Sequence, residues 1–324
     1  MAAAPVLTPD TILHDLAELW VTLGQQGQIE SGNGVLRACS MTLVVVTEPP
    51  DDAQALGETL AALMPEHPAR VIILRLDDPR QPDLAGRVFA QCWMPFGQRR
   101  QICCEQIEIA ASSAALADAL AIVDAVAASD LPVVAWCRSL RLLERPEFRK
   151  LAARVVVDSA RFPDPQTAIQ LLSEVSVARV PVGDLSWTRL TRWRETFAQC
   201  FETRARPDAA QLRVGFGGPT APVQARYMAA WIADSFTRAG TSVTVKMESI
   251  ASASQGELAL VELTAANLRI ELTRRDARLH IDADGMARCV SLPPATDYSL
   301  MREELAIERP DPVFERTLAA ARTL

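Results

Sequence analysis

Polar residues that could bind an anion follow two of the apolar runs in the first half of the chain. Arg138 follows "LPVVAWC", and Asp158, Ser159 and Arg161 follow "ARVVV". If both runs are strands of one parallel sheet, these side chains lie at its carboxyl edge, where doubly wound sheets bind ligands. The four residues are therefore a candidate crevice for a small anionic metabolite such as a sugar phosphate. Helix caps and salt bridges at strand ends explain the same residues equally well.

Residue types that carry other chemistry are sparse. The three histidines lie in unrelated segments, and none has a second ligand at metal-binding spacing. "GFGGPT" (215–220) precedes a predicted helix but lacks the full dinucleotide or P-loop pattern, so it favours a tight turn. "TEPPDDAQ", after the strand near 41–47, also offers no glycines. We therefore expect no catalytic residues, no metal, no nicotinamide or other cofactor, and no dehydrogenase activity of the chain alone.

The seven cysteines are an odd number without regular spacing. In a reducing compartment we expect them to be free thiols, most of them buried. Cys103 and Cys104 are adjacent rather than separated as in a Cys-x-x-Cys redox pair. Since neighbouring residues of a strand face opposite sides, we expect one of these two thiols to be buried.

The segment "GDLSWTRLTRWRETFAQCFE" (183–202) concentrates aromatic and basic residues. It predicts a helix over 187–202, with Asp184 or Ser186 as the N-cap. At 100° per residue one stripe of this helix is apolar, formed by Leu190, Trp193, Phe197, Cys200 and Phe201. We expect Trp187, Trp193 and Phe197 to be structural residues of the core.

The arginines of the same segment divide by face. Arg194 projects into the apolar stripe, where a guanidinium needs a carboxylate, an aromatic face or a partner molecule. We expect it to pair with Asp158 or Asp184. Arg189 and Arg192 lie on the other side, and we predict that they contact a partner protein, because exposed arginines beside aromatics are enriched at interaction hot spots.

The elements that position these residues indicate an α/β protein with two domains. Apolar runs alternate with helical segments in the first half, which predicts a mainly parallel sheet flanked by helices. The four strands expected in it lie near 41–47, 70–76, 132–137 and 154–158. Two longer strands, joined by a turn at 97–98, should form a hairpin.

The polar stretch "TRARPDAAQ" (203–211) is the expected linker. It divides an N-terminal domain (1–205) from a smaller C-terminal α/β domain (206–324). After a helix over 222–240, strand-like runs follow at 241–249, 257–263, 267–273, 277–283 and 286–291. Their close spacing predicts a largely antiparallel sheet in the form of a meander, with "DADG" (282–285) as one hairpin turn.

Composition narrows the function classes. The chain has 324 residues, of which 49% are hydrophobic, enough for sizeable cores. A net charge of -7 argues against a nucleic-acid binder. No run reaches the ~18 apolar residues of a membrane helix, and the start lacks the pattern of a signal peptide. We therefore expect a cytoplasmic protein that contacts neither nucleic acid nor membrane.

The segment 183–202 resembles the D-L-x-W-T-R-L-x-x-W-R stretch of the OpcA family, the glucose-6-phosphate dehydrogenase assembly proteins. Four further stretches agree in order: "HPARVIIL" (67–74), "ICCEQIEI" (102–109), "LPVVAWCRS" (131–139) and "VVVDSARFPD" (155–164). The resemblance covers about residues 40–202, and the C-terminal third carries no such motif.

The resemblance implies a cytoplasmic, non-catalytic bacterial protein that binds glucose-6-phosphate dehydrogenase and promotes its active oligomer. It brings no catalytic or ligand residues with it. The alternative is an enzyme or sensor that binds an anionic metabolite in the strand-end crevice, and a scaffold without any ligand is a third hypothesis. Turnover by the chain in the absence of the dehydrogenase would distinguish an enzyme from an assembly factor.

Overall fold

The computed structural model describes two compact units. Unit 1 is Met1–Val157 and unit 2 is Asp158–Leu324. The residues described are 7–31, 35–49, 51–78, 83–97, 100–178, 180–201, 204–307 and 309–324. Gln98 of the expected hairpin turn, Glu202 of the predicted helix and Thr203 of the expected linker lie outside them.

Unit 1 is built on a mainly parallel sheet whose strands run in the order β1-β5-β3-β2-β6-β7. Their bounds are β1 (Val35–Arg37), β2 (Met41–Thr47), β3 (Ala69–Leu76), β5 (Gln101–Ala111), β6 (Val133–Cys137) and β7 (Arg154–Val157). β4 (Leu84–Trp93) pairs antiparallel with β5 and forms the expected hairpin. The four predicted strands of the first half are all present, and each pairs with its parallel neighbours.

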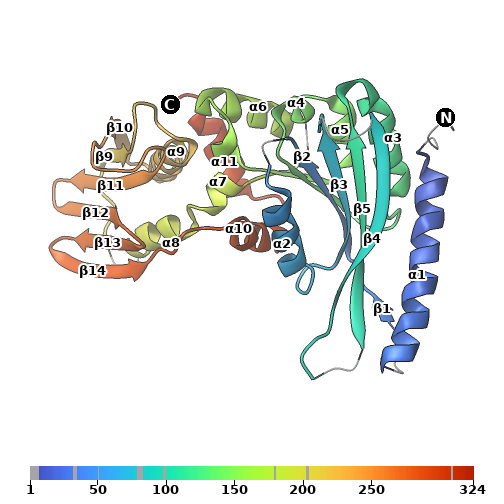
Figure 1. The fold of residues 1–324 in the computed structure, drawn as a ribbon. Helices are drawn as coiled ribbons and strands as arrows, with labels where there is room; N and C mark the ends of the chain where they lie inside the picture. The colour runs from blue at the N-terminus through green and yellow to red at the C-terminus, as the bar shows by residue number, and fades with distance from the viewer. Residues whose placement is uncertain are drawn as a thin grey trace. The chain divides into compact units, whose positions relative to one another are not determined.

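The helices of unit 1 cover this sheet because the connections between parallel strands must cross its faces. They are α1 (Pro9–Ser31), α2 (Ala53–Leu63), α3 (Leu116–Val126), α4 (Leu140–Leu143) and α5 (Pro146–Leu151), with a 3-10 turn, η1 (Ser113–Ala115), before α3. Asp52 caps α2 by accepting from the backbone N–H groups of Gln54 and Ala55. In Figure 1, α1 runs beside β4, on which it packs.

The sheet of unit 2 has the strand order β10-β9-β11-β12-β13-β14. These strands are β9 (Ala209–Phe216), β10 (Ser242–Ser249), β11 (Leu258–Ala265), β12 (Leu268–Arg275), β13 (Arg278–Ala283) and β14 (Met286–Ser291). The last four follow one another as the expected antiparallel meander, and the β13–β14 turn has positive φ at Asp284 and Gly285. Figure 1 shows this sheet in orange and yellow, with α9 (Val223–Arg238) packed against it.

One strand of unit 2 differs from the expectation. β10, predicted to begin the meander, lies at the sheet edge and pairs in parallel with β9. Since α9 connects β9 to β10, the pair forms a β-α-β unit, and parallel pairing follows from that crossover. Between β9 and α9, a Cβ on Gly217 would lie 1.9 Å from the carbonyl oxygen of Ser254, and Gly218 has a positive φ of 94°. Both positions of "GFGGPT" therefore favour glycine for backbone reasons, as the interpretation without a phosphate site implied.

The remaining elements of unit 2 precede and follow its sheet. They are η2 (Ser159–Arg161), α6 (Pro165–Val177), β8 (Val182–Asp184), α7 (Leu185–Thr188), α8 (Thr191–Gln199), α10 (Asp297–Leu305) and α11 (Pro312–Ala321). The units therefore divide at Val157–Asp158 and not at the polar stretch 203–211. The reason is packing: α6 and α7 contact α9, α10 and α11, so the segment 165–199 belongs with the C-terminal elements.

The expectation that all seven cysteines are free thiols is wrong for two of them. Cys92 of β4 and Cys103 of β5 are direct cross-strand partners and form a disulfide. Cys104, Cys137 and Cys200 are free and buried, as expected for structural thiols. Cys103 and Cys104 are both fully buried, because β5 is covered on both of its faces.

Candidate functional site

The segment 183–202 forms two short helices rather than one. α7 begins after Asp184, whose carboxylate accepts from the backbone N–H of Ser186, so one of the two expected N-caps is the one observed. α8 follows after Arg189 and Leu190. α7 contacts η2, α9 and α10, while Trp193 and Phe197 of the apolar stripe lie on α8.

Arg189 and Asp158 form a buried ion pair within unit 2. Two bonds join them, from Nη1 to Oδ1 and from Nη2 to Oδ2, each 2.6 Å long. The Asp158 side chain is 6% exposed and that of Arg189 is 24% exposed. The predicted pairing of Arg194 with Asp158 or Asp184 is therefore wrong, because Arg189 occupies Asp158.

Asp184 lies beside this pair and is fully enclosed. Its carboxylate accepts from the backbone N–H groups of Ser159 and Ser186, at 3.1 and 2.9 Å, and from the Tyr227 hydroxyl at 2.8 Å. Burial raises the pKa of Asp184 to about 6, although its donors act in the opposite direction, and the Asp158 charge raises it further. Burial likewise raises the pKa of Tyr227 well above its usual value.

Trp187 and Arg194 complete this network. The Trp187 indole N–H donates to Asp311 at 3.0 Å, and its ring packs on Tyr227 and Phe314. The guanidinium carbon of Arg194 lies 3.7 Å from the centroid of the Trp187 ring. Of the three partners considered for Arg194, the aromatic face is the one observed. Burial lowers the pKa of Arg194, although the charges of nearby carboxylates, that of Asp311 first, act in the opposite direction.

The predicted apolar stripe is buried except at its end, where Phe201 is half-buried. Trp193 is 3% and Phe197 2% exposed, and Trp187 of α7 is 4% exposed. Arg192 lies on the outer side, with its side chain 58% exposed and 3.4 Å from Glu195. Of the two arginines proposed to contact a partner, Arg192 has a solvent-exposed guanidinium, whereas Arg189 is held by Asp158.

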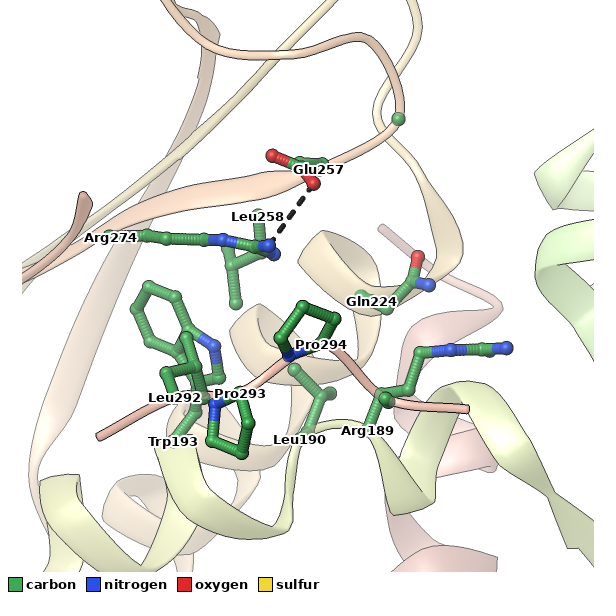
Figure 2. Close-up of a pocket in the computed structure, with 12 residues that line it drawn as sticks. Arg189, Leu190, Trp193, Gln224, Glu257, Leu258, Arg274, Leu292, Pro293 and Pro294 are labelled. Atoms are coloured by element: carbon green, nitrogen blue, oxygen red, sulfur yellow. Dashed lines mark ion pairs between the residues drawn. The ribbon is translucent and has the colours of Figure 1, made fainter. Parts of the chain in front are cut away.

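A pocket of about 300 Å³ opens beside the first turn of α9, within unit 2. Figure 2 shows residues that line it, with Leu190, Trp193, Pro293 and Pro294 on one side and Leu258 beside Arg274 on the other. Arg274 extends over Trp193 toward Glu257, 3.2 Å away, while Arg189 points away from the pocket centre. The Oε1 atom of Gln224 is buried and has no hydrogen-bond partner among the described residues.

The residues of the predicted anion crevice fall in different units. Arg138 belongs to unit 1, where it pairs with Asp51 at 2.8 Å and stacks on Trp136. Asp158, Ser159 and Arg161 belong to unit 2, and of these only Arg161 is exposed. The strand ends of unit 1 also carry acidic residues. Arg141 pairs there with Glu48 and Asp77, each at 2.9 Å, and Arg138 pairs with Asp51, so these two guanidinium groups already have carboxylate partners.

The motif stretches of unit 1 hold its buried charges. Glu105, 3% exposed, accepts from Arg70 at 2.6 Å and from the Trp20 indole at 2.5 Å. Arg70 also donates to the Val126 carbonyl at 2.6 Å. Because "HPARVIIL" and "ICCEQIEI" supply this pair, the motifs of unit 1 specify interior contacts of the fold.

Sequence reasoning missed three partners of the network in unit 2. Tyr227, Glu304 and Asp311 lie in the part of the chain that carries no motif, yet they accept from or donate to Asp184, Thr188 and Trp187. One signal was available for Asp311, because an aspartate followed by a proline is typical of a helix start, and Asp311 is the N-cap of α11. Nothing local indicated the other two.

In the described part of the chain, no group of three or more His, Cys, Asp or Glu side chains is placed to hold a metal ion. None of the described helices is long and apolar enough to cross a membrane. The fold and site define a two-unit α/β protein in which many polar residues of the motif stretches are paired in the interior, both with one another and with residues outside the motifs.

The chain belongs to the family of glucose-6-phosphate dehydrogenase subunits, the OpcA family. The model of the N-terminal domain of this subunit matches residues 61–174, and that of its C-terminal domain matches residues 180–318. Both units therefore carry family sequence, including the C-terminal third in which no motif was evident.

Curated relatives with this name come from cyanobacteria. The OxPP cycle protein OpcA of Nostoc punctiforme is 30% identical over 146 residues, 43% of this chain and 31% of that protein. The OxPP cycle protein OpcA of Synechocystis sp. is 27% identical over 173 residues, 51% of this chain and 35% of that protein. The chain thus matches about a third of the length of these relatives.

Solved structures resemble the chain only distantly. KijD10, a 3-ketoreductase from Actinomadura kijaniata, aligns with a TM-score of 0.45 and 12% identity, covering 87% of this chain and 94% of that one. A Gfo/Idh/MocA family oxidoreductase from Vibrio cholerae aligns with a TM-score of 0.43 and 11% identity, covering 87% and 95%. Likeness at this level transfers neither activity nor cofactor.

Proposed function

We propose that this protein is a non-catalytic, cytoplasmic assembly factor that binds glucose-6-phosphate dehydrogenase and favours its active oligomer in the oxidative pentose phosphate pathway. The observation that carries the proposal is the match of both domain models of the dehydrogenase subunit family, which together reach from residue 61 to residue 318. The names of the cyanobacterial relatives place those proteins in the same pathway.

The geometry of the motifs supports a binding role. The family segment 183–202 contributes its polar groups to buried pairs, in which Arg189 binds Asp158 and Asp184 accepts from Tyr227. Polar groups that are paired inside the fold stabilise the shape of the surface above them. In this proposal, the protein acts by contacting its partner protein through that surface.

The energetic requirement of the proposal is specific. A protein that binds two forms of an enzyme equally well does not change the ratio of those forms, however tightly it binds. To raise the ratio of active to inactive dehydrogenase tenfold, this chain must bind the active oligomer more tightly by about 1.4 kcal/mol.

The test is dehydrogenase kinetics with the purified protein, together with size-exclusion chromatography of the mixture. We expect co-elution, a larger fraction of dehydrogenase in its oligomer and a higher kcat/KM that saturates with added protein. The chain alone should show no turnover with glucose 6-phosphate and NADP. If the kinetics and elution of the dehydrogenase are unchanged at high micromolar concentrations of this protein, the proposal fails.

A second candidate function is the sensing of a small polar metabolite by the pocket beside α9. The observation in its favour is the buried Gln224 Oε1, since a buried acceptor without a donor is costly. A hydroxyl-bearing ligand would satisfy it. A thermal-shift screen of sugars and sugar phosphates, repeated on Gln224→Leu, tests this: the effective ligand should raise the melting temperature of wild type only.

A further inference from the structure

A second hollow of unit 2 is apolar and opens between α8 and α9. We call it the aromatic groove. Four rings line it in a row, Trp231, Phe197, Phe201 and Phe236, with centroid separations of 6.0, 5.2 and 5.1 Å. Its volume is about 310 Å³. Phe197 is buried, whereas the other three rings are half-buried and keep apolar surface in contact with water.

The sequence creates the groove by alternating large and small side chains. Trp231 and Phe236 of α9 line the groove together with Ser235 and the C-cap residue Ala239, and on α8 Phe197 is followed by Ala198. The small residues leave the space that the rings enclose. Covering half-exposed aromatic rings removes apolar area from water, which favours association by roughly 25 cal/mol per Å².

The charged residues among the described lining of the aromatic groove are basic. They are Arg204 and Arg206, and no described residue that lines the groove is acidic. Arg204 is held by Asp284 at 3.0 Å, but Arg206 is exposed and makes no ion pair within the described part of the chain. On a chain with net charge -7, this is a basic and apolar patch.

We propose that the aromatic groove is a docking site for glucose-6-phosphate dehydrogenase and receives an apolar side chain of that enzyme next to a carboxylate. The inference rests on the proposed function and names the surface that performs it. Tryptophan and arginine around an apolar hollow are the composition of interface hot spots. The carboxylate of the partner pairs with Arg206, whose side chain is exposed and makes no ion pair within the described residues.

The test uses the full chain and a substitution that fills the groove without disturbing the core. Ala198 lines the groove and is exposed on a helix, so Ala198→Glu places a carboxylate over the rings at little cost in stability. Ala319, exposed on α11 and outside the groove, provides the matched control Ala319→Glu. Arg206→Glu reverses the charge of the rim.

We expect Ala198→Glu and Arg206→Glu to raise the Kd for the dehydrogenase at least about tenfold, measured by titration calorimetry. Ala319→Glu should bind as wild type does, and all three should melt within about 2 °C of wild type. Raising the salt concentration should weaken dehydrogenase binding by wild type more than binding by Arg206→Glu. The reason is that the attraction between Arg206 and the partner carboxylate is already absent in that variant.

The failure of this inference is distinguishable from failure of the proposed function. If wild type binds the dehydrogenase and Ala198→Glu binds equally well, the groove is not the docking site while the function stands. If wild type does not bind, the function itself fails. If wild type self-associates in sedimentation experiments and Ala198→Glu is monomeric, the occupant is a second copy of this chain and the inference is overturned.

Discussion

Replacing Arg189 by alanine should destabilise unit 2, and this is the sharpest prediction of the structure. The sequence pattern placed Arg189 with Arg192 on an outer face, where both could be removed without effect on folding. The structure instead ties Arg189 to Asp158 through two bonds of 2.6 Å. Truncating Arg189 to alanine would leave the Asp158 carboxylate, whose side chain is 6% exposed, without its cationic partner.

The expected loss of stability depends on the hydrogen-bond donors that Asp158 would keep. Its remaining donors are the Ala160 N–H at 3.3 Å and the Ser186 hydroxyl at 3.4 Å, both long. Removing one partner of a buried ion pair costs about 3–5 kcal/mol. Because the Arg189 side chain is 24% exposed, water can partly replace it, and we expect about 3 kcal/mol. For a unit of this size that loss lowers the melting temperature by about 6–12 °C.

The assay is urea and thermal unfolding followed by circular dichroism, with Arg192→Ala as the matched control. Arg192 is 58% exposed and pairs only loosely with Glu195, so its removal should cost less than about 0.5 kcal/mol. In Asp158→Asn combined with Arg189→Ala, no unpaired charge is left, and part of the lost stability should return. Equal melting temperatures for Arg189→Ala and Arg192→Ala would refute the reasoning.

Three further predictions concern the same unit and one helix of unit 1. Because the pKa of Asp184 is raised to about 6 in the folded protein, protonation of this group stabilises the folded state. This contribution to the free energy of unfolding is complete below about pH 4 and is lost as the pH rises through 6. Relative to Asp184→Asn, wild type should therefore gain about 1 kcal/mol in urea unfolding from pH 7 to pH 5, and a constant difference would contradict this. Trp193→Ala should cost about 3–5 kcal/mol, because the side chain is 3% exposed, and a loss below about 1 kcal/mol in denaturant titration would show that the stripe is not core. Gly217→Ala should cost more than about 2 kcal/mol, since its Cβ would meet the Ser254 carbonyl, whereas Gly24→Ala in α1, with open space around it, should be neutral or stabilising in thermal melts.

Local pattern was sufficient for most of the elements. β2 and β3 are buried along nearly their whole length, and continuous apolar runs of this kind predicted central parallel strands. The stripe through Trp193 and Phe197 had the helical period, so their burial could be predicted even though the helix is broken at Arg189 and Leu190. Periodicity records which face is buried, and a short break changes it little.

Pairing between distant residues could not be predicted in the same way. Arg194 was expected to bind a carboxylate, and Arg189 to be exposed. The choice of Asp158 for Arg189 depends on η2 and α7 lying together. The Cys92–Cys103 disulfide likewise depends on the β4–β5 register, which sets these residues opposite each other. The spacing of residues within one segment specifies neither the register of a hairpin nor the packing of one helix on another.

The sequence by itself determined the fold class, the burial of the aromatic stripe and, through its motifs, the family of this protein. These follow from short-range chemistry: side-chain period, turn residues and the order of apolar runs. Only the tertiary structure decided where the units divide, which carboxylate each arginine binds and where an apolar groove opens between Phe201 and Phe236. The physical reason is that ion pairs and cavities depend on distances of a few ångströms between residues far apart in the chain, and packing alone sets those distances.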